Sequence, residues 1–553
     1  MTLIALPTST GFGGAGSFAA DEAVSSVGVG SGADATTAEA DDFGDSANGV
    51  ESGSVNVAQE AAAFPQSVYQ FGTGVRFDEI LGVVPEIARD GFDSILLAPV
   101  SLPSSTRFVS ADGRIKHGSS YGPVDIHRIN PVVAGIMSRE SFLRGDRLDY
   151  PVGTGWERYG NFVSATKASG IPHVGADMVM GHTARDPGTI AWYEGKFGLE
   201  VYERDYSRSD GIAVRRGLES TGYQGPWDDT APLNFVGAAR GRLLRHQTEA
   251  FVRNMKAGVD LFRLDAAQYL LPGNYLHDLL TSVKHRAGEL GVPRPRFIAE
   301  VLGDYDGVQD DMINAIKSGA DAVFASTHWW NLRDPWYVAL HNRIHDFGGR
   351  MVAFPSNADT PRKLGLQELI MRALLAGATA SYTYMQGAHY GEKPTVFLGE
   401  LSAARSIDLY FGKPSMAAAV TQNALRMLNA LKGEPVFSDD KRLSMDVHGP
   451  LTVITKADKR SEQTAIIAIH TGMDEHGVIY GGKLSVSVPF EGAGILYANN
   501  QHVGWIPHGR DSAGNLVHEF ELIPYGIAVF YQPRADAAME FAQQVAMGGR
   551  TMG

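Results

Sequence analysis

Acidic side chains lie at or near the ends of several short apolar runs, where a charge is expensive to bury unless it is paired or takes part in chemistry. Asp177, Asp265 and Glu300 each lie in such a run. Arg263 precedes Asp265 by two residues, so in a strand both side chains point to the same side and the guanidinium can keep Asp265 ionised. Carboxylates grouped with an arginine are suited to nucleophilic and acid–base chemistry.

These side chains act together only if the fold brings them to one place. From residue 67 to about residue 387, β-branched or aromatic runs alternate with amphipathic stretches such as Phe77–Asp90 and Ala238–Lys256. Eight runs are predicted as strands: Ser67–Phe71, Asp93–Val100, His173–Met180, Asp260–Asp265, Arg296–Val301, Asp321–Thr327, Arg350–Ser356 and Thr379–Met385. Eight repeats predict an α/β fold, a closed (β/α)8 TIM barrel, whose C-terminal strand ends converge on one face.

Two further parts interrupt or follow the alternation. The connection over residues 183–234 is too long for a loop and rich in aromatic and charged residues, which predicts a small inserted domain. Later runs predict an antiparallel β-sandwich domain: Leu451–Thr455, Thr464–His470, Leu484–Pro489 and Gly526–Tyr531. The predicted parts are 1–65 (extension), 66–182 (barrel), 183–234 (insertion), 235–430 (barrel), 431–533 (β-domain) and 534–553 (tail), with a short helix over Ala535–Met547.

Composition excludes several classes of protein. The chain has 553 residues, 44% of them hydrophobic and 20% charged, which is typical of a globular protein with two or three domains. It has no cysteine, so disulfides, thiolate nucleophiles and cysteine-ligated metals are excluded. A formal charge of −14 disfavours nucleic acid or an anionic membrane as a partner, and no run reaches the roughly 18 apolar residues of a membrane span.

The N-terminal stretch has a composition of its own. No Lys or Arg precedes Arg76, while nine Asp or Glu residues lie among Gly, Ala and Ser. Such a segment buries little apolar surface, so we expect residues 1–65 to form a loosely attached acidic extension, and a partner-binding arm is one role open to it. The start lacks the basic residues and long apolar stretch of a secretory signal, which makes the cytoplasm the expected location.

The strand-end motifs occur in an order that resembles the α-amylase family, glycoside hydrolase family 13. The four motifs are ADMVMGH (176–182), GVDLFRLDAA (258–267), IAEV (298–301) and SNADTPR (356–362). Two more stretches are similar to family sequences: SSYGPVD (119–125) and WDDTAPLN (227–234). Each motif alone is weak, but their ordered combination over residues 67–533 is specific. The resemblance implies a retaining enzyme that acts on α-linked glucosides.

The resemblance also implies a role for each candidate residue. Asp265 would be the carboxylate nucleophile, Glu300 the acid and then the base, and Asp359 the third carboxylate, which holds sugar hydroxyls. Tyr121 would stack beneath the reacting sugar. The remaining candidates for binding substrate or supporting the carboxylates are Asp125, Asp177, His182, Arg263 and Arg362. For Asp177, bracing Arg263 and contacting sugar are both open.

Four positions depart from the family pattern. Ala358 stands where most active members have His beside the third carboxylate, which removes a donor to the sugar or makes room for a different one. Gly181 and Tyr269 stand where many members have Asn and His at a calcium site, so we expect neither a structural calcium nor any other cofactor. Gln268 replaces a basic residue that commonly contacts the acceptor side.

Alternatives to a hydrolase remain at this point. The same catalytic set serves transfer to a sugar acceptor, and the sequence does not separate transfer from hydrolysis. A sugar phosphate as donor ranks lower because no dedicated phosphate loop is present. A non-catalytic carbohydrate-binding or scaffold protein is motivated by Ala358 and Gly181, although Asp265 and Glu300 together exceed what such a protein needs.

Overall fold

The structure is a computed structural model of the chain. It describes residues 63–109, 115–146, 148, 150–197, 229–233, 235, 239–301, 307–325, 332–333, 335–355, 365–386, 416–438, 441–458, 460–461, 463–472, 482, 484–488, 493–498, 501–503, 508–510 and 516–531. The chain divides into two units, residues 1–57 and 58–553. The first unit and the predicted helix Ala535–Met547 lie outside the described residues.

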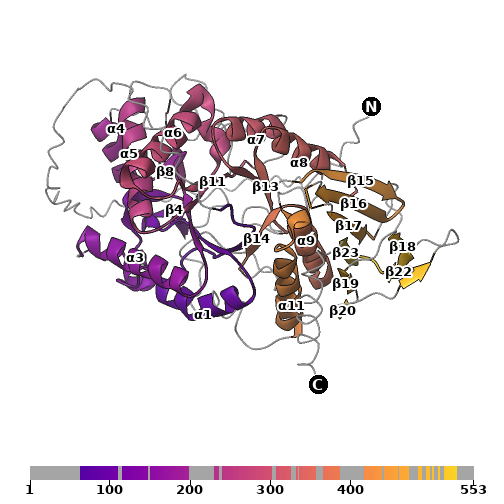
Figure 1. Cartoon of the computed structure of the whole chain (residues 1–553). Helices are drawn as coiled ribbons and strands as arrows, with labels where there is room; N and C mark the ends of the chain where they lie inside the picture. The colour runs from indigo at the N-terminus through magenta and orange to yellow at the C-terminus, as the bar shows by residue number, and fades with distance from the viewer. Residues whose placement is uncertain are drawn as a thin grey trace, which may run out of the picture. The chain divides into compact units, whose positions relative to one another are not determined.

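Eight parallel strands close into a barrel, as the alternating pattern predicts (Figure 1). Around the barrel the order is β1 (Ser67–Gln70), β14 (Ser381–Met385), β13 (Arg350–Ala353), β12 (Ala322–Ala325), β11 (Arg296–Ala299), β10 (Leu261–Leu264), β7 (His173–Met178) and β2 (Ser94–Leu97). All eight predicted runs overlap a barrel strand, and most extend past its end. The extra residues lie where the chain leaves the barrel, which is where the polar residues of the motifs occur.

Helices connect the strands. Their bounds are α1 (Phe77–Arg89), α3 (Val152–Ala168), α5 (Arg240–Lys256), α6 (Tyr275–Leu290), α7 (Val308–Lys317), α8 (Trp336–Asp346), α9 (Leu366–Thr379) and α11 (Met416–Leu431), with shorter α2 (Arg139–Leu143) and α4 (Pro187–Phe197). Helix α1 shows why they form, since Phe77, Ile80, Val84 and Ile87 recur every three or four residues and are all buried. The apolar stripe faces the strands and anchors the helix there.

Side chains fill the inside of the barrel. One buried cluster contains Val68, Leu96, Leu261, Ile298 and Val352, each from a different barrel strand. A Cβ at Gly175 would lie only 2.9 Å from Leu96 Cδ1 and 3.0 Å from Leu261 Cδ2, so the interior is tightly packed. Residues two positions further along the strands therefore lie above this cluster, toward the open face.

Aspartates at the N-terminal ends of three strands hold the neighbouring strand. Asp93 Oδ2 accepts a 2.7 Å hydrogen bond from the Gln66 N–H, and Asp260 Oδ1 accepts one of 3.1 Å from Val174. Asp321 Oδ2 accepts one of 2.9 Å from the N–H of Phe297. The sequence pattern places these aspartates inside strands, but each precedes its strand by one residue. They fix strand register at the end of the barrel opposite the strand-end motifs.

An antiparallel domain follows the barrel, as predicted. Its larger sheet has the order β15 (Leu443–His448), β16 (Leu451–Asp458), β17 (Gln463–His470), β23 (Ile527–Tyr531), β19 (Ala493–Ala498) and β20 (Gln501–Val503). A second sheet contains β18 (Leu484–Val488), β22 (Leu516–Leu522) and β21 (His508–Arg510). Lys456 of β16 is buried and donates a 3.0 Å hydrogen bond to the carbonyl of Thr379, the last residue of α9. This bond attaches the sheet to the barrel.

Short strands and turns cover the open face. They are β3 (Ser101–Pro103) with β6 (Pro123–Ile129), β4 (Arg107–Val109) with β5 (Ile115–His117), and β8 (His182–Ala184) with β9 (Thr230–Pro232), together with the 3-10 helices η1 (Ala267–Leu270) and η2 (Pro272–Asn274). A third 3-10 helix, η5 (Pro435–Phe437), packs instead against β16 and β17 of the antiparallel domain. The described part of the inserted segment consists of β8, α4 and β9, and residues 198–228 of that segment lie outside the described residues.

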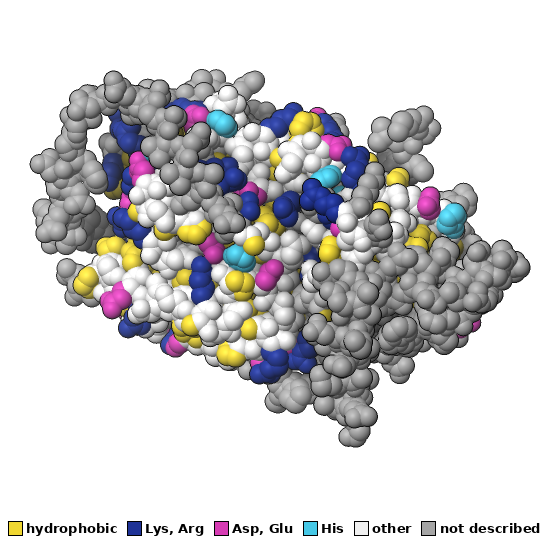
Figure 2. All heavy atoms as spheres, in the orientation of Figure 1, with side chains coloured by type: hydrophobic (Ala, Val, Ile, Leu, Met, Phe, Trp, Pro, Cys, Tyr) yellow, Lys and Arg dark blue, Asp and Glu magenta, His cyan; other side chains and the backbone are white. Residues whose placement is uncertain are grey.

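The described surface carries charges of both signs. Figure 2 shows Lys and Arg interspersed with Asp and Glu on one face of the molecule. Three large hydrophobic residues among those described are exposed, Val152, Trp192 and Phe347, and they lie on or beside different helices. No helix in the described part of the chain has the length and apolarity to cross a membrane.

Candidate active site

Three adjacent barrel strands bring the central residues together. Arg263 of β10 is in register with Asp177 of β7 on one side and with Ile298 of β11 on the other. Beyond the strand ends the ladder continues, since the Asp265 N–H donates 3.1 Å to the Met178 carbonyl and the Glu300 N–H donates 3.0 Å to that of Leu264. The backbone at Asp265 and at Glu300 is thus fixed by main-chain bonds.

Arg263 lies between three carboxylates. Its Nη1 contacts Asp177 Oδ2 and lies 3.5 Å from Asp265 Oδ1, while Nη2 contacts Glu300 Oε1. All four residues are buried, with exposed fractions between 3% and 7%. One guanidinium therefore serves three acidic groups that have little access to water, and this arrangement is held by the planar fork of arginine. We call these four residues the Arg263 cluster.

Burial and charge set the protonation of this cluster. Burial raises the pKa of Asp177 to about 7; the Arg263 charge opposes that rise and the Glu300 charge adds to it. Burial disfavours the charge on Arg263, but Asp177 and Glu300 hold its pKa well above the usual value. Arg263 accordingly stays charged, and burial makes the charge on Asp177 harder to keep than it is in water.

Both carboxylate oxygens of Glu300 are held. Oε1 accepts from Arg263, and Oε2 accepts a 3.0 Å hydrogen bond from the main-chain N–H of Ala266. The sequence analysis gives Glu300 no hydrogen-bond partners, and the structure adds these two donors. Ala266 has φ 46° and ψ 47°, the left-handed conformation that residues other than glycine seldom adopt. No sequence signal marks an alanine for this conformation.

Tyr121 and His182 join the cluster from the covering loops. The hydroxyl of Tyr121 donates a 2.9 Å hydrogen bond to Asp177 Oδ2, and its ring lies 6.0 Å from the guanidinium carbon of Arg263. His182 Nε2 lies 2.8 Å from the main-chain oxygen of Tyr121 and 3.9 Å from Asp265 Oδ2. A single imidazole thus links the Tyr121 loop to Asp265.

Of the remaining predicted site residues, the structure describes Asp125, and it lies outside the Arg263 cluster. Asp125 lies in β6, where its Oδ1 accepts a 2.8 Å hydrogen bond from the N–H of His127, a local contact outside the Arg263 cluster. Asp359, Arg362 and Ala358 lie outside the described residues.

Asp229 supports the loop of Tyr121, a role that the sequence analysis missed. Its Oδ2 accepts a 2.8 Å hydrogen bond from the Ser119 N–H, and its carbonyl accepts one of 2.8 Å from Arg185. The residue is 6% exposed. In the sequence, Asp228 and Asp229 form an acidic pair directly before β9, but the neighbouring residues do not indicate which segment of the chain this pair contacts.

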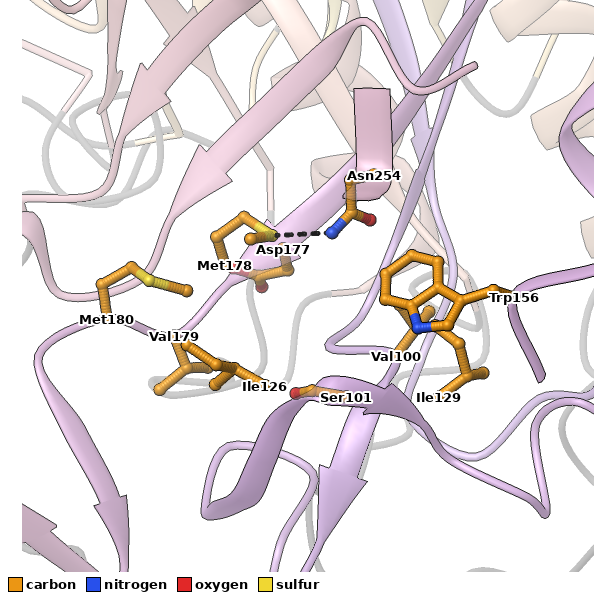
Figure 3. A pocket seen from close by; sticks show the side chains of 10 residues that line it. All are labelled: Val100, Ser101, Ile126, Ile129, Trp156, Asp177, Met178, Val179, Met180 and Asn254. Atoms are coloured by element: carbon orange, nitrogen blue, oxygen red, sulfur yellow. Dashed lines mark hydrogen bonds between the residues drawn. The ribbon is translucent and has the colours of Figure 1, made fainter. Parts of the chain in front are cut away.

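A small cavity lies behind the cluster, on the helix-facing side of β7 (Figure 3). It has a volume of about 10 Å³ and is lined mainly by apolar side chains, including Met178, Met180, Ile126 and Trp156. Of the Arg263 cluster, only Asp177 borders it. A space of this size admits a water molecule but not a sugar, so it is not the substrate site.

Among the residues that the structure describes, no three His, Asp or Glu side chains are placed to hold a metal ion. A Cβ at Gly181 would lie 3.9 Å from the Cβ of Tyr269, so the two positions that depart from the family's calcium pattern are neighbours here.

Known structures share this architecture. An α-amylase from H. orenii superposes with a TM-score of 0.57 and 16% identity, covering 85% of this chain and 99% of that one. An α-amylase from Geobacillus thermoleovorans in complex with acarbose has a TM-score of 0.58 and 12% identity, over 84% and 98% of the chains. An α-glucosyl transfer enzyme has a TM-score of 0.55 and 15% identity, over 85% and 100%.

Sequence comparison gives a shorter match. No family model matches the chain. An α-1,4-glucan:maltose-1-phosphate maltosyltransferase from Burkholderia pseudomallei is 33% identical over 106 residues, which is 19% of this chain and 8% of that relative. The chain thus aligns with a small part of the relative, while the structural matches span nearly all of the enzymes compared. On this evidence, the chain has the barrel fold of the α-amylase family, glycoside hydrolase family 13.

Proposed function

We propose that this protein is a retaining α-glycosidase or transglycosidase that acts on α-linked glucosides through a covalent glycosyl–Asp265 intermediate. The observation that carries the proposal is the Arg263 cluster, in which one buried guanidinium contacts Asp177 and Glu300 and lies 3.5 Å from Asp265. A binding module has no need to bury three carboxylates around one cation, because the arrangement is costly without a chemical task.

The first half of the reaction breaks the glycosidic bond. A carboxylate oxygen of Asp265 attacks the anomeric carbon, and the bond from that carbon to the leaving oxygen breaks. Glu300 gives its proton to the leaving oxygen and becomes a carboxylate. Arg263 and the N–H of Ala266, which contact Glu300, stabilise the negative charge that it gains.

The second half regenerates the enzyme. Glu300, now a base, takes a proton from water or from a sugar hydroxyl, whose oxygen attacks the anomeric carbon while the bond to Asp265 breaks. Water gives hydrolysis and a sugar gives transfer. Tyr121 provides a ring beside the cluster for the bound sugar. By family resemblance, Asp359 holds sugar hydroxyls, with Asp125, His182 and Arg362 as further supports.

A set of glucosides and one covalent trap test the proposal. Maltose, sucrose, trehalose, maltodextrins and 4-nitrophenyl α-glucoside are incubated with the full chain, and products are separated by chromatography. A 5-fluoro glucosyl fluoride should add one glycosyl unit to the peptide that contains Asp265, as seen by mass spectrometry. Asp265→Asn and Glu300→Gln should each lower turnover by a factor of about 1,000 or more. Absence of both turnover and adduct overturns the proposal and favours the binding or scaffold alternative.

A sugar-phosphate donor is a second candidate, favoured by the 33% identical segment shared with the maltosyltransferase. In this reaction the leaving group would be phosphate, and the anomeric carbon would again pass through Asp265. The test measures phosphate release from maltose 1-phosphate in the presence of maltodextrin. Release that exceeds turnover of every neutral glucoside would make this the main activity, and no release removes it.

A further inference from the structure

The turn that follows Asp265 binds Glu300 at two points. The Ala266 N–H donates a 3.0 Å hydrogen bond to Oε2 of the Glu300 side chain. The next N–H, that of Ala267, donates one of 2.8 Å to the main-chain carbonyl of Glu300. Nucleophile and acid are therefore connected through one turn of main chain, two residues long, with no intervening side chain.

The turn has an unusual backbone conformation at Ala266. Ala266 has φ 46° and ψ 47° and is 2% exposed. An L-residue with a Cβ adopts this region with strain, and such strain persists where the surroundings enforce it. Successive N–H groups of an extended strand point to opposite sides, so the N–H of Ala266, which follows the Asp265 N–H bonded to β7, points toward β11 and Glu300. The left-handed conformation of Ala266 acts on the chain after this N–H, and with it the next N–H, that of Ala267, also reaches Glu300.

We propose that Ala266 is a positioning residue for acid catalysis, whose N–H holds the Glu300 carboxyl in place and stabilises the charge it gains on giving up its proton. This inference rests on the proposed function. A hydrogen bond to an ionised acceptor is about twice as strong as one to a neutral acceptor. The Ala266 bond therefore strengthens as the proton leaves, so it stabilises the transition state more than the ground state.

Leaving-group dependence tests the proposal, because acid catalysis matters most when the leaving group is poor. The rate constant kcat/KM is measured for aryl α-glucosides with phenols of increasing pKa, up to maltose. Ala266 is replaced by its α-hydroxy acid, lactic acid, through nonsense suppression, which turns one peptide N–H into an ester oxygen. We expect kcat/KM to fall about 10- to 100-fold for maltose and less than about 3-fold for a dinitrophenyl glucoside.

Two matched controls separate positioning from stability. The same ester at Ala267 removes the neighbouring bond to the Glu300 carbonyl and should leave the leaving-group slope unchanged. Ala266→Gly keeps the N–H and accepts the left-handed conformation without strain, so it should also keep the wild-type slope. Equal slopes for the esters at Ala266 and Ala267 overturn the proposal.

Failure of the proposed function gives a different result. If Glu300→Gln leaves the slope unchanged, Glu300 is not the acid, and both the function and the Ala266 inference are wrong. If Glu300→Gln steepens the slope while the Ala266 ester does not, only the Ala266 inference is wrong.

A measurement on the unsubstituted chain covers the case in which the ester variants do not fold. The protein is labelled with ¹⁵N-alanine, and the Ala266 amide signal is assigned by its loss in Ala266→Gly. Its proton shift should differ between wild type and Glu300→Gln, because the substitution replaces the carboxyl acceptor of the Ala266 N–H by an amide oxygen. The same shift in both proteins overturns the proposal.

Discussion

The hydroxyl of Tyr121 and the carboxyl of Asp177 are joined by a 2.9 Å hydrogen bond to Oδ2, the same oxygen that Arg263 contacts. The covering loop thus reaches the Arg263 cluster through the side chain of Tyr121. This bond favours the ionised carboxyl and lowers the pKa of Asp177, which burial raises to about 7.

Tyr121→Phe should therefore raise the pKa of Asp177 further. More of this carboxyl stays protonated at neutral pH, which changes the charge around Arg263. The C=O stretch of a protonated carboxyl in infrared difference spectra, followed against pH, measures the change. Asp177→Asn is the control in which that band must be absent. A titration midpoint that moves downward in Tyr121→Phe contradicts the interpretation.

Asp229→Ala should lower kcat/KM by about 10-fold while changing the melting temperature little, because it frees the Ser119 N–H and loosens the loop that carries Tyr121. Asp229→Asn keeps an oxygen acceptor for that N–H and should recover most of the activity. Steady-state kinetics on the best glucoside decide the point. Equal losses in both variants would show that the charge of Asp229, and not its hydrogen bond, is what matters.

Arg263→Lys should reduce turnover by a factor of about 100 or more, although the positive charge is kept. An ammonium lacks the planar fork that reaches Asp177 and Glu300 at once. Arg372→Lys on α9 is the matched control, since Arg372 is also buried but pairs with Glu368 of the same helix. It should change stability and leave kcat near wild type. Comparable losses of kcat in both variants would indicate a general effect of replacing a buried arginine.

Two partly buried histidines should make the protein less stable as the pH falls. His127 Nε2 lies 3.1 Å from His246 Nδ1. Burial, and then the charge of Arg253, lower the pKa of His127 to about 4. Burial, and then the charge of His127, lower the pKa of His246 to about 3. Between pH 6.5 and 4 the unfolded chain binds more protons than the folded chain, so the free energy of unfolding decreases as the pH falls, by on the order of 3 kcal/mol. Asp125 opposes this shift for His127, and Lys196 adds to it.

Denaturant unfolding at pH 4 to 7 measures this dependence. His246→Gln should flatten it, because the variant cannot take up a proton at that position on unfolding. His285→Gln should not, since the His285 side chain is 72% exposed. A slope that is the same in wild type and His246→Gln would rule out the histidine pair as its source.

Asp321→Ala should lower the free energy of unfolding by about 2 to 3 kcal/mol and leave kcat unchanged. It removes the acceptor for the Phe297 N–H and leaves Arg294 and Arg296 without their shared carboxylate. These contacts lie at the end of the barrel away from the Arg263 cluster, where side chains serve stability. Denaturant unfolding and steady-state kinetics on the same preparation test both halves; a fall in kcat at full stability would contradict this reading.

The alternation of apolar runs and amphipathic stretches was enough to predict all eight barrel strands and the antiparallel domain after them. The prediction succeeds because the spacing of apolar residues in a strand or helix depends only on residues nearby in the sequence. Repeated strand–helix units can also pack in only a few ways. The same pattern predicted that Asp177, Arg263, Asp265 and Glu300 lie near one another, since they follow neighbouring strands. Strand ends were less well predicted, as the position of Asp93, Asp260 and Asp321 before their strands shows.

Tertiary structure alone decided how those residues pair. From spacing, Arg263 was expected to accompany Asp265 on its own strand, but its shortest contacts reach Asp177 and Glu300 on the strands to either side. The same is true of three other features. The Ser119–Asp229 bond and the His127–His246 pair join segments far apart in the chain. The turn after Asp265 depends on the backbone angles of one residue, Ala266. Periodicity carries information about which face a residue occupies, whereas the choice among partners on that face is made by packing across strands and loops.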